Sequence, residues 1–163
     1  MSERFDVIVV GAGAAGMMAA IAAAQRGAKT LVLERNEKVG RKIAITGKGR
    51  CNVTNACTRD GFFDAVKHNP RFLYSGYAAF DRNDTMAFFE KMGVPLKVER
   101  GNRVFPVSDR AFDIVDALRN GMRRAGAQLL CGVRVKELWI DDGVLCGVRD
   151  ETGREYESTS VVV

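Results

Sequence analysis

A glycine-rich segment near the N-terminus, VIVVGAGAAGMMAAIAAA from Val7 to Ala24, constrains the fold more than any other feature of the sequence. It has no charged residue, but the six residues before it, MSERFD, lack the net positive charge that begins a signal peptide. The β-branched run before the glycines is typical of a buried strand, and the Ala- and Met-rich run after them is typical of a helix. The segment therefore predicts a strand, a turn and a helix, and not a membrane anchor.

The glycines have the spacing GxGxxG, and their context strengthens this otherwise weak signal. In a dinucleotide-binding turn the first glycine permits the bend, the second lets a pyrophosphate approach, and the third allows close packing of the helix on the strand. The amides at the start of the helix then face the anion. Gly27 ends the predicted helix, and Thr30–Leu33 forms a second strand. The predicted phosphate turn consists of Gly11, Ala12, Gly13, Ala14, Ala15 and Gly16.

An acid closes the second predicted strand. Glu34 follows Gly11 by 23 residues, close to the usual spacing of about 20 in this motif. Its carboxylate can accept hydrogen bonds from ribose hydroxyls and would repel a 2′-phosphate. FAD or NAD is therefore favoured over NADP, although Arg35, the next residue, weakens that exclusion.

The segment from Arg35 to Ala56 is a long connection with six basic residues and three glycines. It is longer than an ordinary loop between two elements of a compact domain. Basic side chains and free amides could hold phosphates there. On composition alone, a solvated basic loop is an equal alternative.

Residues Gly40–Asn55, GRKIAITGKGRCNVTN, resemble the signature of the YhiN/BaiN-like family of FAD-dependent oxidoreductases, also called aminoacetone-oxidase-like flavoproteins. The N-terminal GAGAAG…LVLE and the segment Gly101–Leu118 are also similar to that family. The resemblance implies a glutathione-reductase-type FAD domain, with a substrate domain inserted further along the chain. It places Arg41 and Lys42 near the FAD phosphates.

The resemblance also implies the rest of the cofactor site. It places a residue near Val135 against the adenine and a short run of residues toward the flavin. That run comprises Gly49, Arg50, Cys51 and Asn52.

Four cysteines occur without a CxxC pair, which indicates a reducing cytosol and a cytoplasmic protein. Cys51 and Cys57 have five residues between them, whereas the redox pairs of related disulfide reductases have four. We therefore interpret Cys51 as a packed thiol near the cofactor. Cys131 and Cys146 fall in strand patterns and are expected in the core.

The fold class is predicted as α/β, with a Rossmann-like doubly wound parallel sheet, a three-stranded antiparallel meander and a truncated C-terminal end. Residues 1–163 are interpreted as the N-terminal part of an FAD-binding domain. Its expected segments are a βαβ unit and phosphate loop (1–58), a helical segment with a small hairpin (59–126), and a third strand, meander and further parallel strand (127–163). We expect such a fragment to bind FAD weakly or not at all, and its uncovered apolar sheet surface to favour self-association.

The remaining elements follow from turn signals and apolar periodicity. Helices are expected at Phe62–Asn69, Arg71–Phe80, Asn83–Met92 and Ala111–Ala125, the last with Ser108 or Asp109 as its N-cap. The last helix has an apolar stripe of Ile114, Val115, Leu118 and Met122. Five aromatic side chains are expected in the core: Phe62, Phe63, Phe72, Phe88 and Phe89. Strands are expected at Leu96–Glu99, Arg103–Phe105, Gln128–Cys131, Arg134–Ile140, Val144–Arg149, Arg154–Glu157 and Ser160–Val163.

The function expected from these features is hydride transfer through FAD, from NAD(P)H to a small organic acceptor. The alternatives are a fragment of an NAD-binding dehydrogenase and a non-catalytic nucleotide-binding module. No catalytic acid, base or nucleophile stands out, and no metal site is expected. The net charge of +5 is too weak and too dispersed to indicate nucleic acid, and no membrane association is expected. The oligomeric state is open.

Overall fold

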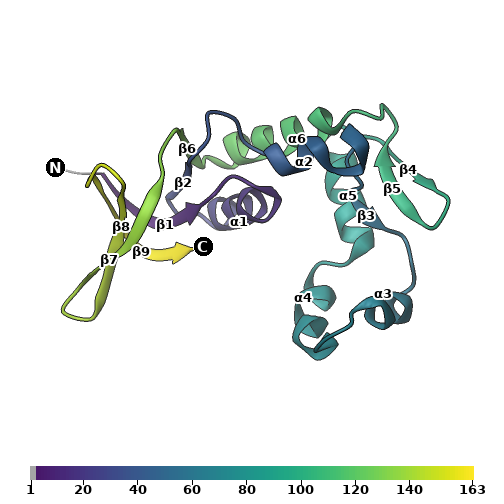
Figure 1. Ribbon diagram of the computed structural model, residues 1–163, viewed down its shortest axis with the longest axis horizontal. Helices are drawn as coiled ribbons and strands as arrows, with labels where there is room; N and C mark the ends of the chain where they lie inside the picture. Colours follow the sequence, from purple (N-terminus) through teal and green to yellow (C-terminus); the bar gives the residue numbers. More distant parts are fainter. Residues whose placement is uncertain (1–2) are drawn as a thin grey trace. The chain divides into compact units, whose positions relative to one another are not determined.

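The computed structural model describes residues 3–163, which form two compact units. The first contains the residues up to Ile43 together with Leu118–Val163, and the second is Ala44–Ala117. The C-terminal third of the chain thus packs with the N-terminal strands, and the intervening residues form a body of their own (Figure 1).

The first unit is built on a six-stranded sheet with the order β6-β2-β1-β9-β8-β7. Its parallel part comprises β6 (Gln128–Cys131), β2 (Thr30–Glu34), β1 (Arg4–Val10) and β9 (Glu155–Val162). β2 is buried along its whole length, as expected for a central parallel strand. The predicted Rossmann-like sheet and its third strand, Gln128–Cys131, are confirmed.

The antiparallel meander is also present, with β7 (Val135–Asp141) and β8 (Val144–Asp150) leading into β9. Its strands extend the sheet at the β9 side. One expectation about it is wrong, because Arg154–Glu157 and Ser160–Val163 are not separate strands. β9 is continuous, pairing antiparallel with β8 in its first half and parallel with β1 in its second.

The polar residues in the middle of β9 explain why the sequence suggested a break. Ser158 is buried, and its hydroxyl donates to the Ser160 carbonyl at 3.1 Å. The Thr159 hydroxyl donates to the Asp6 carbonyl at 2.9 Å. Both hydroxyls are thereby satisfied inside the sheet, so the strand continues through them.

Helix α1 (Ala14–Gln25) connects β1 to β2 and buries Met17, Ala20, Ile21 and Ala24. A Cβ atom added at Gly16 would lie 2.0 Å from the Gly11 carbonyl oxygen. The helix therefore approaches the glycine turn as closely as the motif predicts. Gly27 follows the helix with φ +85°, which confirms its predicted place at the C-terminal end.

The second unit contains a small antiparallel sheet of three strands and several short helices. The segment Arg35–Ala56 is not one loop, because α2 (Arg41–Ile45), a 3-10 turn η1 (Thr46–Gly49) and β3 (Thr54–Asn55) interrupt it. The helix expected at Arg71–Phe80 is divided into a 3-10 turn and a short helix. The remaining elements are α3 (Arg59–Ala65), η2 (Pro70–Leu73), α4 (Tyr74–Ala79), α5 (Arg82–Lys91), β4 (Leu96–Glu99), β5 (Arg103–Pro106) and α6 (Ala111–Ala125).

Burial corrects three expectations about apolar side chains. Phe72, expected in the core, is 78% exposed, whereas Phe89 is 6% exposed as expected. Cys131 is exposed and Cys146 is half-buried, so neither belongs to the core. The predicted apolar stripe of α6 is confirmed, because Ile114, Val115, Leu118 and Met122 are all buried.

No helix within residues 3–163 is long and apolar enough to cross a lipid bilayer. The uncharged stretch that begins at Val7 is divided between β1, the glycine turn and α1, as the position of its glycines predicts.

Substituting Gly16 by Ala should lower the free energy of unfolding by about 1–3 kcal/mol, because the new methyl group would overlap the Gly11 carbonyl. Gly76→Ala is the matched control. Gly76 is also helical, but nothing lies within 4 Å of an added Cβ, so Ala should stabilise by up to about 1 kcal/mol. Urea denaturation followed by circular dichroism measures both changes. Equal effects of the two substitutions would contradict the close approach.

Candidate functional site

The glycine turn lies between β1 and α1, at the carboxyl end of the parallel strands. Gly11 has φ +98°, a conformation that favours glycine, and its N–H donates to the Leu33 carbonyl at 2.8 Å. Gly13 occupies the N-cap position of α1. No side chain caps the helix start, and its first turn contains no acid. The N–H groups and positive dipole end of α1 are therefore available to an anion.

The surface at the start of α1 has room for a ligand. Gly13, Ala14 and Ala15 are exposed, and no heavy atom lies within 4 Å of a Cβ built at Gly13. Gly13 is therefore not required by packing, in contrast to Gly16. The absent side chain leaves open the space that the motif assigns to a pyrophosphate.

Glu34, at the end of β2, is only 7% exposed and binds directly to the turn. Its Oε2 accepts a hydrogen bond from the Ala12 N–H at 2.7 Å. Its Oε1 accepts from the backbone N–H of Asn36 at 2.9 Å and from the Asn36 side-chain amide at 2.5 Å. The carboxylate thus joins the phosphate turn to the residues that follow β2.

These donors determine the charge of Glu34. Burial alone would raise the pKa of its carboxyl group. The N–H groups of Ala12 and Asn36, and the nearby Arg35, stabilise the anion enough to hold the pKa below its ordinary value. Glu34 is therefore ionised at neutral pH, in the form that accepts hydrogen bonds from ribose hydroxyls.

Asn36 is a site residue that the sequence reasoning missed. Its side-chain oxygen accepts a hydrogen bond from Arg41 Nη1 at 2.6 Å, while its amide nitrogen donates to Glu34. In addition, the Gly40 N–H donates to the Ala12 carbonyl at 2.9 Å. The only available signal was an amide residue two positions after the strand-end acid, where a side chain can turn back on the backbone.

The link from β6 to β7 also lies against the end of β2. The Val133 N–H donates to the Glu34 carbonyl at 2.9 Å, and the Gly132 N–H donates to the Asn36 carbonyl at 3.2 Å. Val135, predicted to lie near the adenine, is half-buried and packs with Val133 against the core cluster that contains Phe5.

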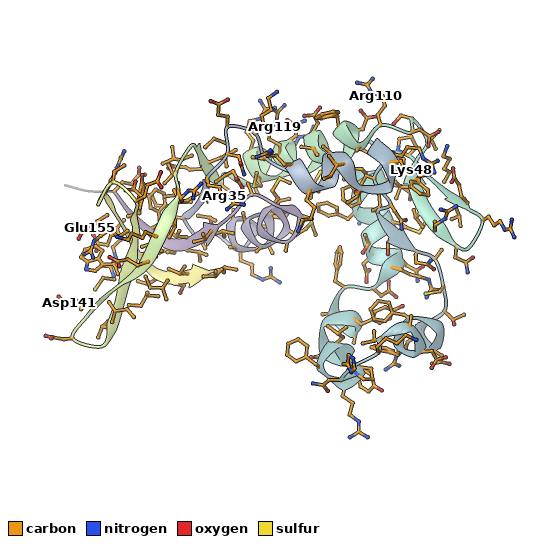
Figure 2. The ribbon with its side chains drawn as sticks, viewed as in Figure 1. Arg35, Lys48, Arg110, Arg119, Asp141 and Glu155 are labelled. Atoms are coloured by element: carbon orange, nitrogen blue, oxygen red, sulfur yellow. The ribbon has the colours of Figure 1, made fainter. Side chains whose placement is uncertain are left out.

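The predicted site residues are divided between the two units. The first unit brings together the turn from Gly11 to Gly16, Glu34, Arg35, Arg41, Lys42 and Val135. Of these, Arg35, Arg41 and Lys42 are exposed, and Figure 2 shows Arg35 at the surface. Gly49, Arg50, Cys51 and Asn52 belong to the second unit.

Arg50 is the centre of a charge cluster within the second unit. Its guanidinium donates to Glu99 Oε1 at 2.9 Å and to Asp109 Oδ1 at 3.1 Å, and it stacks on the Phe105 ring at 4.1 Å. Lys97 contributes a second cation, 2.7 Å from Asp109 Oδ2. The hydrogen bond from Arg50 holds the pKa of Glu99 below its usual range, and that from Lys97 does the same for Asp109.

Both N-cap candidates for α6 lie before its first residue, Ala111. Asp109 has φ +56° and its carboxylate is bound to the two cations. The Ser108 hydroxyl accepts from the Arg110 N–H at 3.3 Å and donates to Asp113 at 2.6 Å.

The turn before β3 is held by backbone contacts. Gly47, Gly49 and Cys51 all have positive φ, and the Cys51 N–H donates to the Thr46 carbonyl at 3.0 Å. Asn52, with its amide oriented to donate, lies 3.2 Å from the Val104 carbonyl and 3.0 Å from that of Thr54. Lys48, also in this turn, is exposed (Figure 2).

Cys51 is a packed thiol, as expected. It is 6% exposed, and burial raises its pKa even though a hydrogen bond with Thr46 opposes the shift. Both Cys51 and Cys57 are free thiols. Among residues 3–163, no three His, Cys, Asp or Glu side chains are arranged to hold a metal ion.

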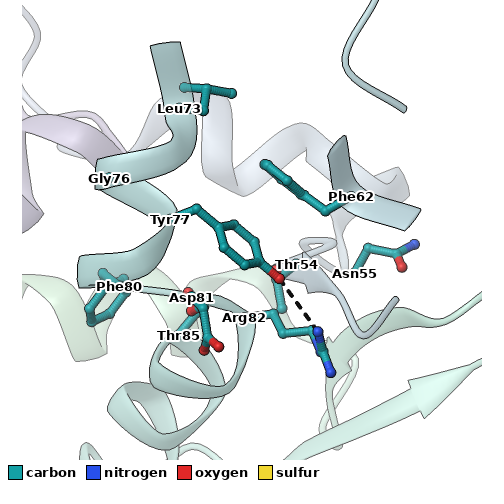
Figure 3. Close-up of a pocket in the computed structure, with 10 residues that line it drawn as sticks. All are labelled: Thr54, Asn55, Phe62, Leu73, Gly76, Tyr77, Phe80, Asp81, Arg82 and Thr85. Carbon is teal, nitrogen blue, oxygen red and sulfur yellow. Dashed lines mark hydrogen bonds between the residues drawn. The ribbon is translucent and has the colours of Figure 1, made fainter. Parts of the chain in front are cut away.

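A cavity of about 280 Å³ lies within the second unit (Figure 3). The Tyr77 and Phe62 ring centroids lie 4.6 Å apart with the rings tilted by 32°, and the Tyr77 hydroxyl lies 3.4 Å from Arg82 Nη1. The cavity therefore has aromatic walls and a polar edge, and no motif in the sequence indicated it. Its lining consists of Thr54, Asn55, Phe62, Leu73, Gly76, Tyr77, Phe80, Asp81, Arg82 and Thr85.

The parallel sheet, the GxGxxG turn and the strand-end acid define a dinucleotide-binding domain of the Rossmann type, with the fold used by flavin-dependent oxidoreductases. The chain belongs to the family described as HI0933-like protein Rossmann domain, which matches residues 5–163. This family is the one that the sequence resembles.

Two relatives illustrate the family's range. The chain is 36% identical over 132 residues to the 3-dehydro-bile acid delta(4,6)-reductase of Clostridium scindens, covering 80% of this chain and 32% of the relative. It is 39% identical over 161 residues to the ribosomal RNA dihydrouridine synthase of Escherichia coli, covering 99% of this chain and 37% of the relative. The chain thus spans about a third of the length of these curated relatives.

Solved structures confirm the fold. A flavocytochrome c3 fumarate reductase superposes with a TM-score of 0.64 at 23% identity, covering 99% of this chain and 33% of that one. Sdh1 of Mycobacterium smegmatis gives a TM-score of 0.66 at 21% identity, covering 98% and 33%.

The Cys51 thiol should be protected in the native protein. Burial raises the pKa of both the Cys51 and the Cys131 thiol, but Cys51 is buried and Cys131 is exposed to the reagent. Alkylation of Cys51 by iodoacetamide at pH ~8 should therefore be at least about tenfold slower than that of Cys131. In urea the two thiols should react at similar rates. Mass spectrometry of the labelled peptides measures both rates, and rapid native labelling of Cys51 would contradict its packed state.

Proposed function

We propose that the chain binds the ADP half of FAD and serves as the FAD-binding part of a flavin-dependent reductase. The observation that carries this proposal is the bond between Glu34 and the Ala12 N–H. This bond fixes an ionised carboxylate beside the open helix start at Gly13, which supports a role for Glu34 as the ribose acceptor. A pyrophosphate and an adjacent ribose need this combination of a donor-rich turn and a fixed carboxylate.

Each group in the first unit has a role toward FAD. The amides of Gly13, Ala14 and Ala15 would bind the pyrophosphate, and Glu34 the ribose hydroxyls. Arg41 and Lys42 would add positive charge near the FAD phosphates. Val135 would provide an apolar contact for the adenine. When bound, FAD supplies the hydride chemistry, and these residues hold and orient it.

The second unit would supply the flavin-side contacts proposed for Gly49, Arg50, Cys51 and Asn52. The Arg50 cluster supports this role by fixing the turn. Arg50 is tied to Glu99, Asp109 and the Phe105 ring, so the neighbouring backbone is held in one conformation. Fixed backbone donors and a packed thiol suit the binding of a rigid ring system.

For the chemistry we propose reduction of a carbon–carbon double bond conjugated to a carbonyl, with NAD(P)H as the hydride donor. The names of both relatives support this class. One describes a reductase of delta(4,6) bile acids, and the other the formation of dihydrouridine, in which a double bond of the base is saturated. The proposed acceptor is a small planar ring compound.

A second candidate acceptor is a uridine within RNA. It is favoured by one observation, the 39% identity to the ribosomal RNA dihydrouridine synthase over nearly the whole chain. The modest and dispersed positive charge favours the small molecule. Assays with a conjugated cyclic enone and with unmodified ribosomal RNA, each following NAD(P)H oxidation, separate the two candidates.

Identification of the bound nucleotide tests the central proposal. The complete protein should be purified, denatured by heat and the released nucleotide identified by chromatography and absorbance. FAD is the expected result. Release of NAD would favour the dehydrogenase alternative, and FAD without any NAD(P)H oxidation would favour a non-catalytic nucleotide-binding module.

Gly13→Val should leave the complete protein folded but unable to retain FAD. The backbone at Gly13 has φ −79° and the site of the new Cβ is empty, so the fold tolerates the side chain. The branched group would instead fill the pyrophosphate approach. Flavin absorbance per mole of protein after dialysis measures the loss, with Gly76→Ala as the control that stays yellow. Full flavin content in Gly13→Val would show that the turn is not the phosphate site.

A further inference from the structure

The side-chain amide of Asn36 forms a bridge between an anion and a cation, to which it donates and from which it accepts a hydrogen bond, respectively. Its amide nitrogen donates to Glu34 Oε1, and its amide oxygen accepts from Arg41 Nη1. A carboxylate can only accept and a guanidinium can only donate, so the orientation of the amide is determined by its partners. An amide is therefore the group that can join these two ions without changing the charge of the site.

The bridge is anchored in the backbone on both sides. The Asn36 N–H donates to Glu34 Oε1 at 2.9 Å, and the Asn36 carbonyl accepts from the Gly132 N–H at 3.2 Å. Glu34 in turn binds the Ala12 N–H in the glycine turn. A continuous path of hydrogen bonds thus runs from the phosphate turn through Glu34 and Asn36 to Arg41.

We propose that Asn36 is a positioning residue that couples the ribose acceptor, Glu34, to the phosphate-side cation, Arg41, so that both are prearranged for one dinucleotide. This inference rests on the proposed binding of FAD. Asn36 is not required to touch the nucleotide. It fixes the Glu34 carboxylate in one rotamer and draws the exposed Arg41 side chain to the same edge of the sheet.

The coupling has a consequence for specificity. A Glu34 carboxylate that is fixed and ionised rejects a 2′-phosphate, and loosening it should weaken that rejection. Loss of the Asn36 amide should therefore reduce the preference for an unphosphorylated ribose as well as the affinity for FAD.

The charged groups around Glu34 define the expected pH dependence. Arg35 on the same strand end favours the anion, Cys131 on the paired strand β6 faces it as a thiol, and Arg41 reaches it only through Asn36. Because the folded pKa of Glu34 is lowered, its contribution to stability is present above the ordinary carboxyl pKa and is lost as pH falls through the lowered value. Removing the Asn36 amide should move this loss to higher pH.

The isosteric variant Asn36→Asp tests the bridge in the complete protein. It keeps the shape and the acceptor for Arg41 but replaces the donor to Glu34 with a second carboxylate. FAD affinity, measured by fluorescence titration of the deflavinated protein, should fall by about tenfold or more, the scale of a lost hydrogen bond to a charged group. Glu37→Gln, at an exposed position in the same segment, is the matched control and should leave the affinity unchanged.

A double-mutant cycle shows whether Asn36 acts through Glu34. Asn36→Asp should cost about tenfold in the wild-type background but much less in a Glu34→Gln background, where no charge remains to be repelled. Equal losses in both backgrounds would overturn the proposal, because Asn36 would then contribute through packing or through direct contact.

A nucleotide-free measurement separates this inference from the proposed function. Asn36→Ala adds no titratable group. The melting temperature of this variant is measured against pH without nucleotide. Its decline in acid, the acid limb, should begin at a higher pH than in the wild type and in Glu37→Gln. An unchanged acid limb would overturn the coupling, whether or not FAD binds. A wild-type protein that shows the coupling but binds no FAD would instead overturn the proposed function and the ribose role together.

Discussion

The hydrogen bond from the Ala12 N–H to Glu34 is the interaction on which the candidate site depends. It connects the turn after β1 to the end of β2, and the Gly11 N–H supports it by donating to the Leu33 carbonyl. These bonds orient the start of α1 toward the space beside Gly13. Parallel strands bring their carboxyl ends to one edge of a sheet, so a turn and an acid 22 residues apart meet there.

The glycines of the turn have different physical roles. Gly16 is needed for close packing and Gly11 for its backbone conformation, whereas Gly13 is needed for neither of these. α1 is buried on the face formed by Met17 and Ala20, so a charge there would be desolvated. The uncharged stretch is thus a strand and a helix packed on each other, and the start of the helix offers backbone amides, without a capping side chain, to an anion.

The sequence predicts what depends on local pattern and spacing. The strand–turn–helix unit, the bounds of Gln128–Cys131 and Ala111–Ala125, and the buried stripe of α6 all follow from such patterns. It does not predict what depends on distant partners. Arg50 binds Glu99 and Asp109 across 49 and 59 residues. β9 continues through its polar residues because it pairs with β1, whose Asp6 carbonyl accepts a hydrogen bond from the Thr159 hydroxyl. The exposure of Phe72 and the hydrogen bonds of Asn36 with Glu34 and Arg41 were also not predicted, because neither is encoded by periodicity.

The basic residues in Arg35–Ala56 have different partners, so they are not equally available to bind phosphates. Arg50 is neutralised by Glu99 and Asp109, and Arg41 is bound to a neutral amide and keeps its charge. Cations with neutral partners can attract phosphates, whereas a cation paired with two carboxylates fixes structure. We therefore propose that the basic segment divides by function, with charge for the phosphates near Arg41 and Lys42, and a rigid turn around Arg50.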